Sequence, residues 1–353
     1  MKIKSGFLLG PALFLASTLF AQAPGAPTMG PTAAQAPMTE KEVITELKKA
    51  GADQLLKDLD KRGVAFEMDP DIEKRLRKAK ATDDVIKAVT AAGPKERAAA
   101  AKAAAMASGQ VIISPEESAD FKALQTELDP DKAIALAESF AQKYPKSEVL
   151  SYVYSFEANA YEMKGDAPKI VEYAEKSLAL KQDNLMSLLI AAYAIPTPQY
   201  LNLHQADQEK QLTKAENYAQ EALKAIDALK KQANESDADF ARRKAGYISG
   251  IHADLGMIHL ERAQEGLMGL DQGELAKAEK EYRLSVTGAE HPDPSAYYRM
   301  GEACRLQGKV EDAIAAFTKA SELGQGTVVK QYADEQIDML KKAKAQPGTP
   351  AKP

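Results

Sequence analysis

The sequence predicts an all-α protein: a right-handed α-solenoid of about five helical hairpins, preceded by a small domain of helical hairpins. Three observations favour this fold. Of the 353 residues, 45% are apolar but only 6% are aromatic. Helix-start signals recur along the chain. A pattern of small and large residues also returns after 34 residues, from Tyr154 to Leu188, and such a period is typical of stacked helical hairpins.

Charge and cysteine content exclude several classes of protein. With 46 Lys and Arg against 51 Asp and Glu, the formal net charge is -5, which argues against a protein that binds nucleic acid through a basic face. Cys304 is the single cysteine. It therefore forms no internal disulfide and no thiolate zinc site, and no cysteine near the N-terminus can carry a lipid anchor.

Residues 1–21 are expected to be a signal peptide. Lys2 and Lys4 precede the apolar run Phe7–Leu15, and small residues surround Ala21. This order of charge, apolar run and small residues is that of a secretory signal. Cleavage is expected after Ala21, which makes the protein periplasmic or secreted. The alternative is an uncleaved membrane anchor, but the run is shorter than the ~20 apolar residues of a spanning helix, and no later segment is apolar enough to span.

Composition divides the rest of the chain. Residues 22–37 are rich in Pro and Ala, which predicts a disordered linker. A small helical domain is expected at 38–92, and 93–113 is an Ala-rich linker. The main helical domain then covers 114–345, and the tail 346–353 is expected to be disordered.

The small domain contains an internal duplication. The segment from Leu47 to Lys57 is similar to the segment from Leu76 to Lys87. Each copy is expected to be two short helices joined by a tight turn. Thr39 with Glu42 forms a capping box at the first helix, and further helix starts are expected at Asp69-Pro70 and Thr82.

A basic cluster in this domain has two interpretations. It could bind an anionic polymer or a lipid headgroup, or it could be a solvated helix face. We favour the solvated face because 38–92 carries twelve basic and twelve acidic residues. The cluster consists of Lys74, Arg75, Arg77, Lys78 and Lys80.

The repeat is clearest over 294–320. This segment resembles a tetratricopeptide repeat through Tyr297, Met300, Gly301, Gly308, Ala313, Phe317 and Ala320. In such a repeat, small residues allow two antiparallel helices to approach closely, while large ones fill the space between neighbouring hairpins.

The same spacing of four and three residues recurs upstream. The first helices carry the sets Tyr154/Ala158/Tyr161, Leu188/Ala192/Ile195, His252/Gly256/His259 and Tyr297/Gly301/Cys304. The second helices carry Ala133/Ala137/Phe140, Ile170/Ala174/Ser177, Ala215/Ala219/Ala222, Ala278/Tyr282/Ser285 and Ala313/Phe317/Ala320. The resemblance implies five hairpins over 114–325, with a capping helix over 328–342.

The two central repeats carry insertions, at 196–200 and 265–270. Two extended helices are also expected to meet near 234–236. Insertions in repeat arrays lie in loops on one face, often the binding face. The apolar triplet Leu267, Met268 and Leu270 is therefore a candidate contact with a partner. The alternative is that it packs under the extended helices.

No group of residues predicts catalysis. His252 and His259 lie seven residues apart and could form a metal pair, but they occupy repeat positions that pack in the other hairpins. Cys304 lacks an adjacent base. Phosphate loops, nucleophile elbows and metalloprotease pairs are missing from the sequence. We therefore expect no enzyme, cofactor or metal.

The resemblance implies a groove lined by the first helix of each hairpin. Its middle is apolar and aromatic and its ends are polar, which suits a peptide with a few apolar anchors. The basic carboxylate clamp of cytosolic chaperone adaptors is not reproduced. The alternative is that the protein's own tails or insertions fill the groove. The candidate groove residues are Tyr152, Ser155, Asn159, Met186, Leu189, Tyr193, Met257, Tyr298, Glu302 and Arg305.

Three functions follow from these patterns. The first is a non-catalytic exported scaffold or adaptor that binds a protein or peptide of the bacterial cell envelope. The second is a carrier or sensor of a small ligand, with 38–92 gating the array. The third is a metalloenzyme that uses His252 and His259.

Overall fold

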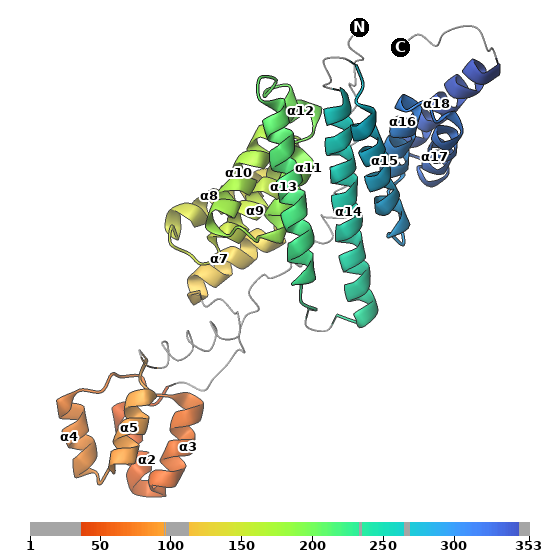
Figure 1. Cartoon of the computed structure of the whole chain (residues 1–353). Helices are drawn as coiled ribbons and strands as arrows, with labels where there is room; N and C mark the ends of the chain where they lie inside the picture. The colour runs from red at the N-terminus through yellow and green to blue at the C-terminus, as the bar shows by residue number, and fades with distance from the viewer. Residues whose placement is uncertain (1–36, 95, 97–112, 233–234, 265–268, 346–353) are drawn as a thin grey trace. The chain divides into compact units, whose positions relative to one another are not determined.

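Every regular element in the described part of the chain is a helix (Figure 1). The computed structural model describes residues 37–94, 96, 113–232, 235–264 and 269–345. Within these ranges there are 16 helices and no strands, so the all-α prediction is confirmed. In the same ranges, none of the helices has the length and apolarity needed to cross a membrane. The chain divides into two compact units between Ser114 and Pro115.

The smaller unit contains four short helices, each begun by a local signal. The Thr39 capping box is present: the Thr39 side chain accepts from Glu42 N, and Glu42 Oε2 accepts from Thr39 N at 2.7 Å. Asp69 caps the third helix and Thr82 the fourth, as predicted. The helices are α2 (Glu40–Ala50), α3 (Ala52–Arg62), α4 (Pro70–Lys78) and α5 (Asp83–Ala91).

Equivalent positions of the duplication are buried in this unit. Leu47 and Leu76 correspond, as do Leu55 and Val85, and all four belong to one apolar core. The backbone of Met38 pairs with the segment after α3, donating to Gly63 O at 2.9 Å. The core and this pairing hold the four helices together.

The basic cluster of this unit is partly neutralised. Arg75 pairs with Glu40 at 2.6 Å, and Arg77 pairs with Glu73 and Asp83, each at 2.8 Å. These side chains are exposed, so the pairs contribute little to stability. They do cancel local charge, which supports the interpretation as a solvated face.

The larger unit is a series of helices in which each long helix packs against the next long helix along the chain. The short α12 lies in the predicted insertion and packs against α10. The elements are α7 (Pro115–Thr126), α8 (Pro130–Lys143), α9 (Leu150–Lys164), α10 (Ala167–Leu180), α11 (Leu185–Ala194), α12 (Pro198–Leu201), α13 (Gln208–Asp227), α14 (Asp237–Gln264), α15 (Gln272–Thr287), α16 (Pro294–Leu306), α17 (Val310–Leu323) and α18 (Val328–Ala345).

Small and large residues meet at the predicted positions. A Cβ atom on Gly256 would lie 2.9 Å from the ring of Tyr282, and one on Gly301 would lie 2.7 Å from the ring of Phe317. Only glycine therefore allows α15 to approach α14, and α17 to approach α16, this closely. Both rings are fully buried.

The expected pair of extended helices is present as α13 and α14. An ion pair closes the connection between them, with Arg243 Nη2 lying 2.8 Å from Glu235 Oε2 and both side chains at most 10% exposed. Of the predicted insertion triplet, Leu267 and Met268 lie outside the described residues. Leu270 is 41% exposed, so it does not pack under the extended helices.

Candidate binding face

The first helices of the predicted hairpins contact one another in series: α9 contacts α11, α11 contacts α14, and α14 contacts α16. The candidate groove residues follow one another at spacings of three and four along these helices, which places them on one side of each helix. We call this side of α9, α11, α14 and α16 the first-helix face.

The structure separates the ten candidate residues into two groups. Four are buried, with 3 to 8% of their surface exposed: Tyr152, Ser155, Met186 and Tyr298. The other six are partly exposed: Asn159, Leu189, Tyr193, Met257, Glu302 and Arg305. Only the second group offers appreciable surface to a partner.

Ser155 belongs to a buried polar network rather than to an accessible surface. Its Oγ lies 2.9 Å from Ser187 Oγ and 3.2 Å from Ser177 Oγ. Asn184 donates from Nδ2 to Ser155 Oγ at 2.9 Å and to Ser177 Oγ at 3.0 Å. These residues join α9, α10 and the start of α11. The hydroxyl of Ser155 therefore has its hydrogen-bond partners inside the protein.

Other buried candidates also have internal partners. The Tyr152 hydroxyl accepts from Lys181 Nζ at 2.7 Å. The ring of Tyr298 packs against Phe317, with ring centroids 5.3 Å apart. Among the exposed candidates, Glu302 accepts a hydrogen bond from Arg299 Nη1 at 2.8 Å, so its charge is neutralised.

Sequence reasoning missed two acidic residues on the first-helix face. Glu162 follows Asn159 by three residues on α9, and Asp254 precedes Met257 by three residues on α14. Both are partly exposed. The spacing of three residues that selected the other candidates would have selected these two as well.

The two carboxyls lie in an environment that disfavours their charge. Burial raises the pKa of Glu162 to about 7. Burial, followed by repulsion from Glu162, raises the pKa of Asp254 well above its ordinary value. Burial also raises the pKa of Tyr193 on α11, with smaller contributions from Glu162, Asp254 and Asp293. These groups thus act on one another across three neighbouring helices.

The two histidines of α14 both bind glutamates of α15. His252 Nδ1 lies 2.7 Å from Glu281 Oε2, and His259 Nδ1 lies 2.7 Å from Glu274 Oε2. Within the described residues, no group of three or more His, Cys, Asp or Glu side chains could hold a metal ion. The contacts of both histidines therefore tie α14 to α15.

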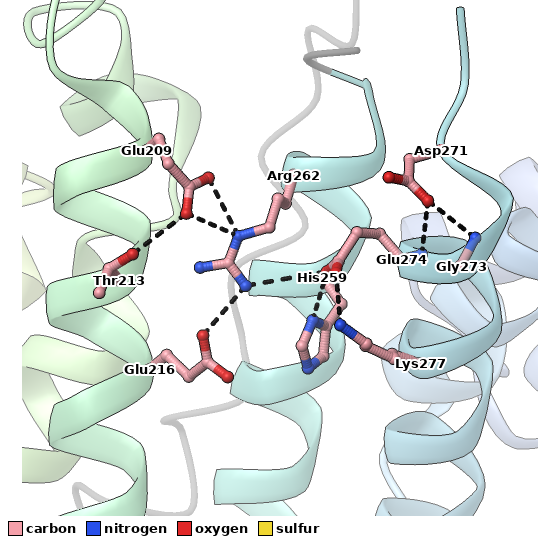
Figure 2. Close-up of polar contacts among 9 residues, drawn as sticks. All are labelled: Glu209, Thr213, Glu216, His259, Arg262, Asp271, Gly273, Glu274 and Lys277. Carbon is pink, nitrogen blue, oxygen red and sulfur yellow. Dashed lines mark hydrogen bonds and ion pairs between the residues drawn. The ribbon is translucent and has the colours of Figure 1, made fainter.

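Figure 2 shows that the His259 contact is part of a larger charge network. Arg262 on α14 reaches α13, where its Nε lies 3.0 Å from Glu209 Oε2 and its Nη1 lies 3.0 Å from Glu216 Oε2. Glu274 also accepts from Lys277 Nζ at 2.6 Å. Burial opposes the charge of Glu274, but the bonds from Lys277 and His259 leave its pKa below the ordinary value.

Cys304 has the environment of a packing residue. It is 1% exposed in the core between α15, α16 and α17. Burial raises the pKa of its thiol to about 11. A thiol in this state is a poor nucleophile at neutral pH.

No protein family model matches the chain, and no curated protein matches it significantly.

Proposed function

We propose that this chain is a non-catalytic, exported tetratricopeptide-repeat scaffold or adaptor that binds protein or peptide partners in the bacterial cell envelope. The observation that carries this proposal is the series of contacts from α9 through α11 and α14 to α16. This series offers one extended face of first-helix side chains, the arrangement through which repeat arrays bind. The packing of Tyr282 on Gly256 and of Phe317 on Gly301 supports the repeat assignment.

In this proposal the larger unit is a right-handed solenoid of five hairpins closed by a capping helix. The hairpins are α7 with α8, α9 with α10, α11 with α13, α14 with α15, and α16 with α17. The helix α18 then covers the last hairpin, against which it packs.

The partly exposed residues of the first-helix face indicate the chemistry of the partner. Leu189, Tyr193 and Met257 are apolar or aromatic and come from the two central first helices. Aromatic and flexible apolar side chains are common anchors in binding interfaces. A peptide with one or two apolar side chains at its centre fits this distribution.

Export rests on residues 1–21, which lie outside the described residues. The signal peptide therefore stays a prediction, as does the periplasmic or secreted location. Amino-terminal sequencing of the mature protein tests it directly. The expected first residue is Gln22, whereas a sequence that begins at Met1 in the mature cell-envelope protein would contradict export by a cleaved signal.

The proposed function is tested by cross-linking mass spectrometry on intact cells. The variant combines Tyr193→Ala with Met257→Ala, and the control is Leu284→Ala on α15, which removes an apolar side chain that is 43% exposed. We expect partner recovery to fall about tenfold in the double variant, which corresponds to a loss of about 1.4 kcal/mol of binding free energy. Recovery should stay unchanged in the control.

Equal recovery from all three proteins would contradict binding through this face. A small-ligand carrier gives a different result. When the metabolite fraction of a cell extract is added to the purified protein, without any protein partner, the melting temperature of the protein rises. A metalloenzyme would retain a bound transition metal after purification, measured by elemental analysis.

A further inference from the structure

Arg305 differs from the other arginines of the larger unit because no acid pairs with it. Its side chain makes no hydrogen bond or ion pair with the described residues, and its buried Nε atom is left without an acceptor. A guanidinium stays charged and carries five N–H donors, and a buried donor without a partner destabilises the folded protein. The other described arginines of this unit each have a carboxylate within 3.0 Å: Arg242, Arg243, Arg262, Arg283 and Arg299.

The position of Arg305 is at one end of the first-helix face. Tyr298, Glu302 and Arg305 are spaced four and three residues apart, so they share one side of α16. This helix is the last of the four first helices, and it contacts α14. Arg305 is partly exposed, so a ligand that lies on the face can reach its guanidinium.

The acid one turn before Arg305 already has a partner. Glu302 Oε2 lies 2.8 Å from Arg299 Nη1, and the two side chains are 22% and 19% exposed. This pair of opposite charges adds little net charge to the side of α16. Arg305 therefore gives this end of the face a positive charge that no ion pair cancels among the described residues.

A row of side chains from the neighbouring helices leads along the face to Arg305. Tyr193, Met257 and Glu302 each directly follow the small residue of their repeat, so they hold equivalent positions on α11, α14 and α16. Because α11 contacts α14 and α14 contacts α16, these three positions follow one another across the face. Arg305 lies one turn beyond the last of them.

The ligand that suits an unpaired guanidinium in a peptide-binding face is a carboxylate. Its two oxygens match the fork of N–H donors on arginine, and the resulting charge-assisted bonds are stronger than those between neutral groups. Such a bond also fixes the direction of a bound peptide, because the carboxylate must lie on one side of the apolar side chains. Tyr193 and Met257 alone would not impose this direction.

We propose that Arg305 binds the side-chain carboxylate of an aspartate or glutamate in the partner peptide, on the α16 side of the apolar residues that contact Tyr193 and Met257. This inference rests on the proposed function, because it assigns the chemistry of the partner at the first-helix face. The partner therefore carries an acidic residue close to its apolar anchors, and always on the same side of them.

The test selects random peptides displayed on phage for binding to the purified protein. The C-terminus of each peptide is fused to the coat protein, so that side chains supply its only carboxylates. The test variant is Arg305→Gln. The control is Arg283→Gln on α15, whose side chain is 55% exposed and whose partner Glu279 keeps the ion pair with Lys309 at 2.6 Å.

We expect the wild type and the control to select peptides with an acidic residue on one fixed side of the apolar residues. Arg305→Gln should keep the apolar residues and lose the preference for an acid, and Arg305→Glu should select lysine or arginine at the same place. One selected peptide is then compared with its amide counterpart by fluorescence anisotropy, at about 150 mM salt to screen distant charges. Arg305→Gln should weaken binding of the acidic peptide about tenfold and of the amide peptide less than about twofold.

Two results would overturn the inference. The first is an equal preference for acids in the peptides selected by the wild type and by Arg305→Gln. The second is an equal loss of affinity for the acidic peptide and its amide counterpart, which indicates a change in the face rather than a lost ion pair. Thermal melts guard against misfolding, because Arg305→Gln removes no ion pair and should melt close to the wild type.

Failure of this inference is distinguishable from failure of the proposed function. If peptide selection depends on Tyr193 and Met257 but the preference for acids does not depend on Arg305, the face binds peptides through apolar contacts and only the carboxylate site is wrong. If the wild type selects no peptides, or if Tyr193→Ala with Met257→Ala selects the same peptides as the wild type, binding through the first-helix face is wrong and the carboxylate site with it.

Discussion

The ring of Tyr282 lies over Gly256, with three ring carbons 2.9 Å from where a Cβ atom would stand. This contact sets how closely α14 and α15 approach. The equivalent contact one hairpin later, Phe317 over Gly301, has no hydroxyl and packs only through its ring.

Substitution of Gly256 by alanine should destabilise the protein. The added methyl would overlap the Tyr282 ring, and overpacking of this kind costs about 1–3 kcal/mol. The matched control is Gly250→Ala on the same helix, where no atom lies within 4 Å of the new Cβ. This control should gain about 0.5–1 kcal/mol from helix propensity. Urea unfolding of both variants measures the difference, and equal shifts of the two would contradict the contact.

Two adjacent arginines on α14 should differ sharply in their effect on stability. Arg243 and its partner Glu235 are 7% and 10% exposed, whereas Arg242 and its partner Glu290 are 55% and 58% exposed. Arg243→Ala leaves a carboxylate with little access to water, so we expect a loss of about 2 kcal/mol or more. Arg242→Ala should leave the unfolding midpoint unchanged.

The same pair predicts an acid dependence. The hydrogen bonds from Arg243 lower the pKa of Glu235 to about 2. The stability that this group contributes is therefore present above its ordinary pKa of 4.5 and is lost as the pH falls towards 2. In Arg243→Ala, the melting temperature should therefore fall less than in the wild type as the pH is lowered from 4.5 towards 2. Thermal melts at a series of pH values from 2 to 5 measure this dependence. If the melting temperature of Arg243→Ala fell with pH as much as that of the wild type, the result would argue against the pairing.

Glu157 predicts that stability falls as the pH rises, which is the opposite of the dependence expected for Glu235. Its side chain is 0% exposed on α9, and burial raises its pKa to about 7 although the Tyr173 hydroxyl and Lys176 oppose the shift. The stability that Glu157 contributes is therefore present below its ordinary pKa of 4.5 and is lost as the pH rises through about 7. This loss amounts to about 3 kcal/mol.

Glu157→Gln should remove that loss, so that stability changes less between pH 5 and 7 than in the wild type. Glu172→Gln on α10 is the control, because hydrogen bonds from Lys169 and Lys176 lower the pKa of Glu172. Glu172 therefore changes the stability only at pH values below this interval. Urea unfolding at a series of pH values measures both. Identical pH profiles for wild type and Glu157→Gln would show that Glu157 is not the buried acid responsible.

Cys304 should be unreactive in the folded protein. Its thiol is 1% exposed, and the rise in its pKa from 9.0 to about 11 reduces the thiolate fraction about a hundredfold. We expect Ellman's reagent at pH 8 to modify the native protein at least about a hundredfold more slowly than the protein in guanidinium chloride. Fast modification without denaturant would mean that the α16 core opens readily.

The helices could be predicted from sequence because their signals are local. Thr39 and Glu42 lie within one turn, and the glycine at 256 and the tyrosine at 282 follow a fixed repeat spacing. The accessibility of each candidate contact could not be predicted in the same way. Periodicity gives the side of a helix on which Ser155 lies, but burial depends on how closely α10 and α11 approach, which depends on residues far along the chain.

The acidic pair illustrates the same limit. The spacing alone could have added Glu162 and Asp254 to the candidate residues. Their lack of partners could not be seen from the sequence, because basic residues are abundant and any of them could have formed a pair. In the structure Arg299 binds Glu302 on its own helix, α16, and no basic side chain of the described residues contributes to the pKa of either carboxyl.

The buried hydroxyls of Ser155, Ser177 and Ser187, joined by Asn184, have a consequence for how the hairpins align. Faces built from alanine are smooth, so two such helices can slide along one another by a turn at little cost. A set of hydrogen bonds shared by three helices is complete in one alignment only. These four residues therefore select one alignment of α9, α10 and α11, and so fix where Asn159 and Tyr193 stand relative to each other.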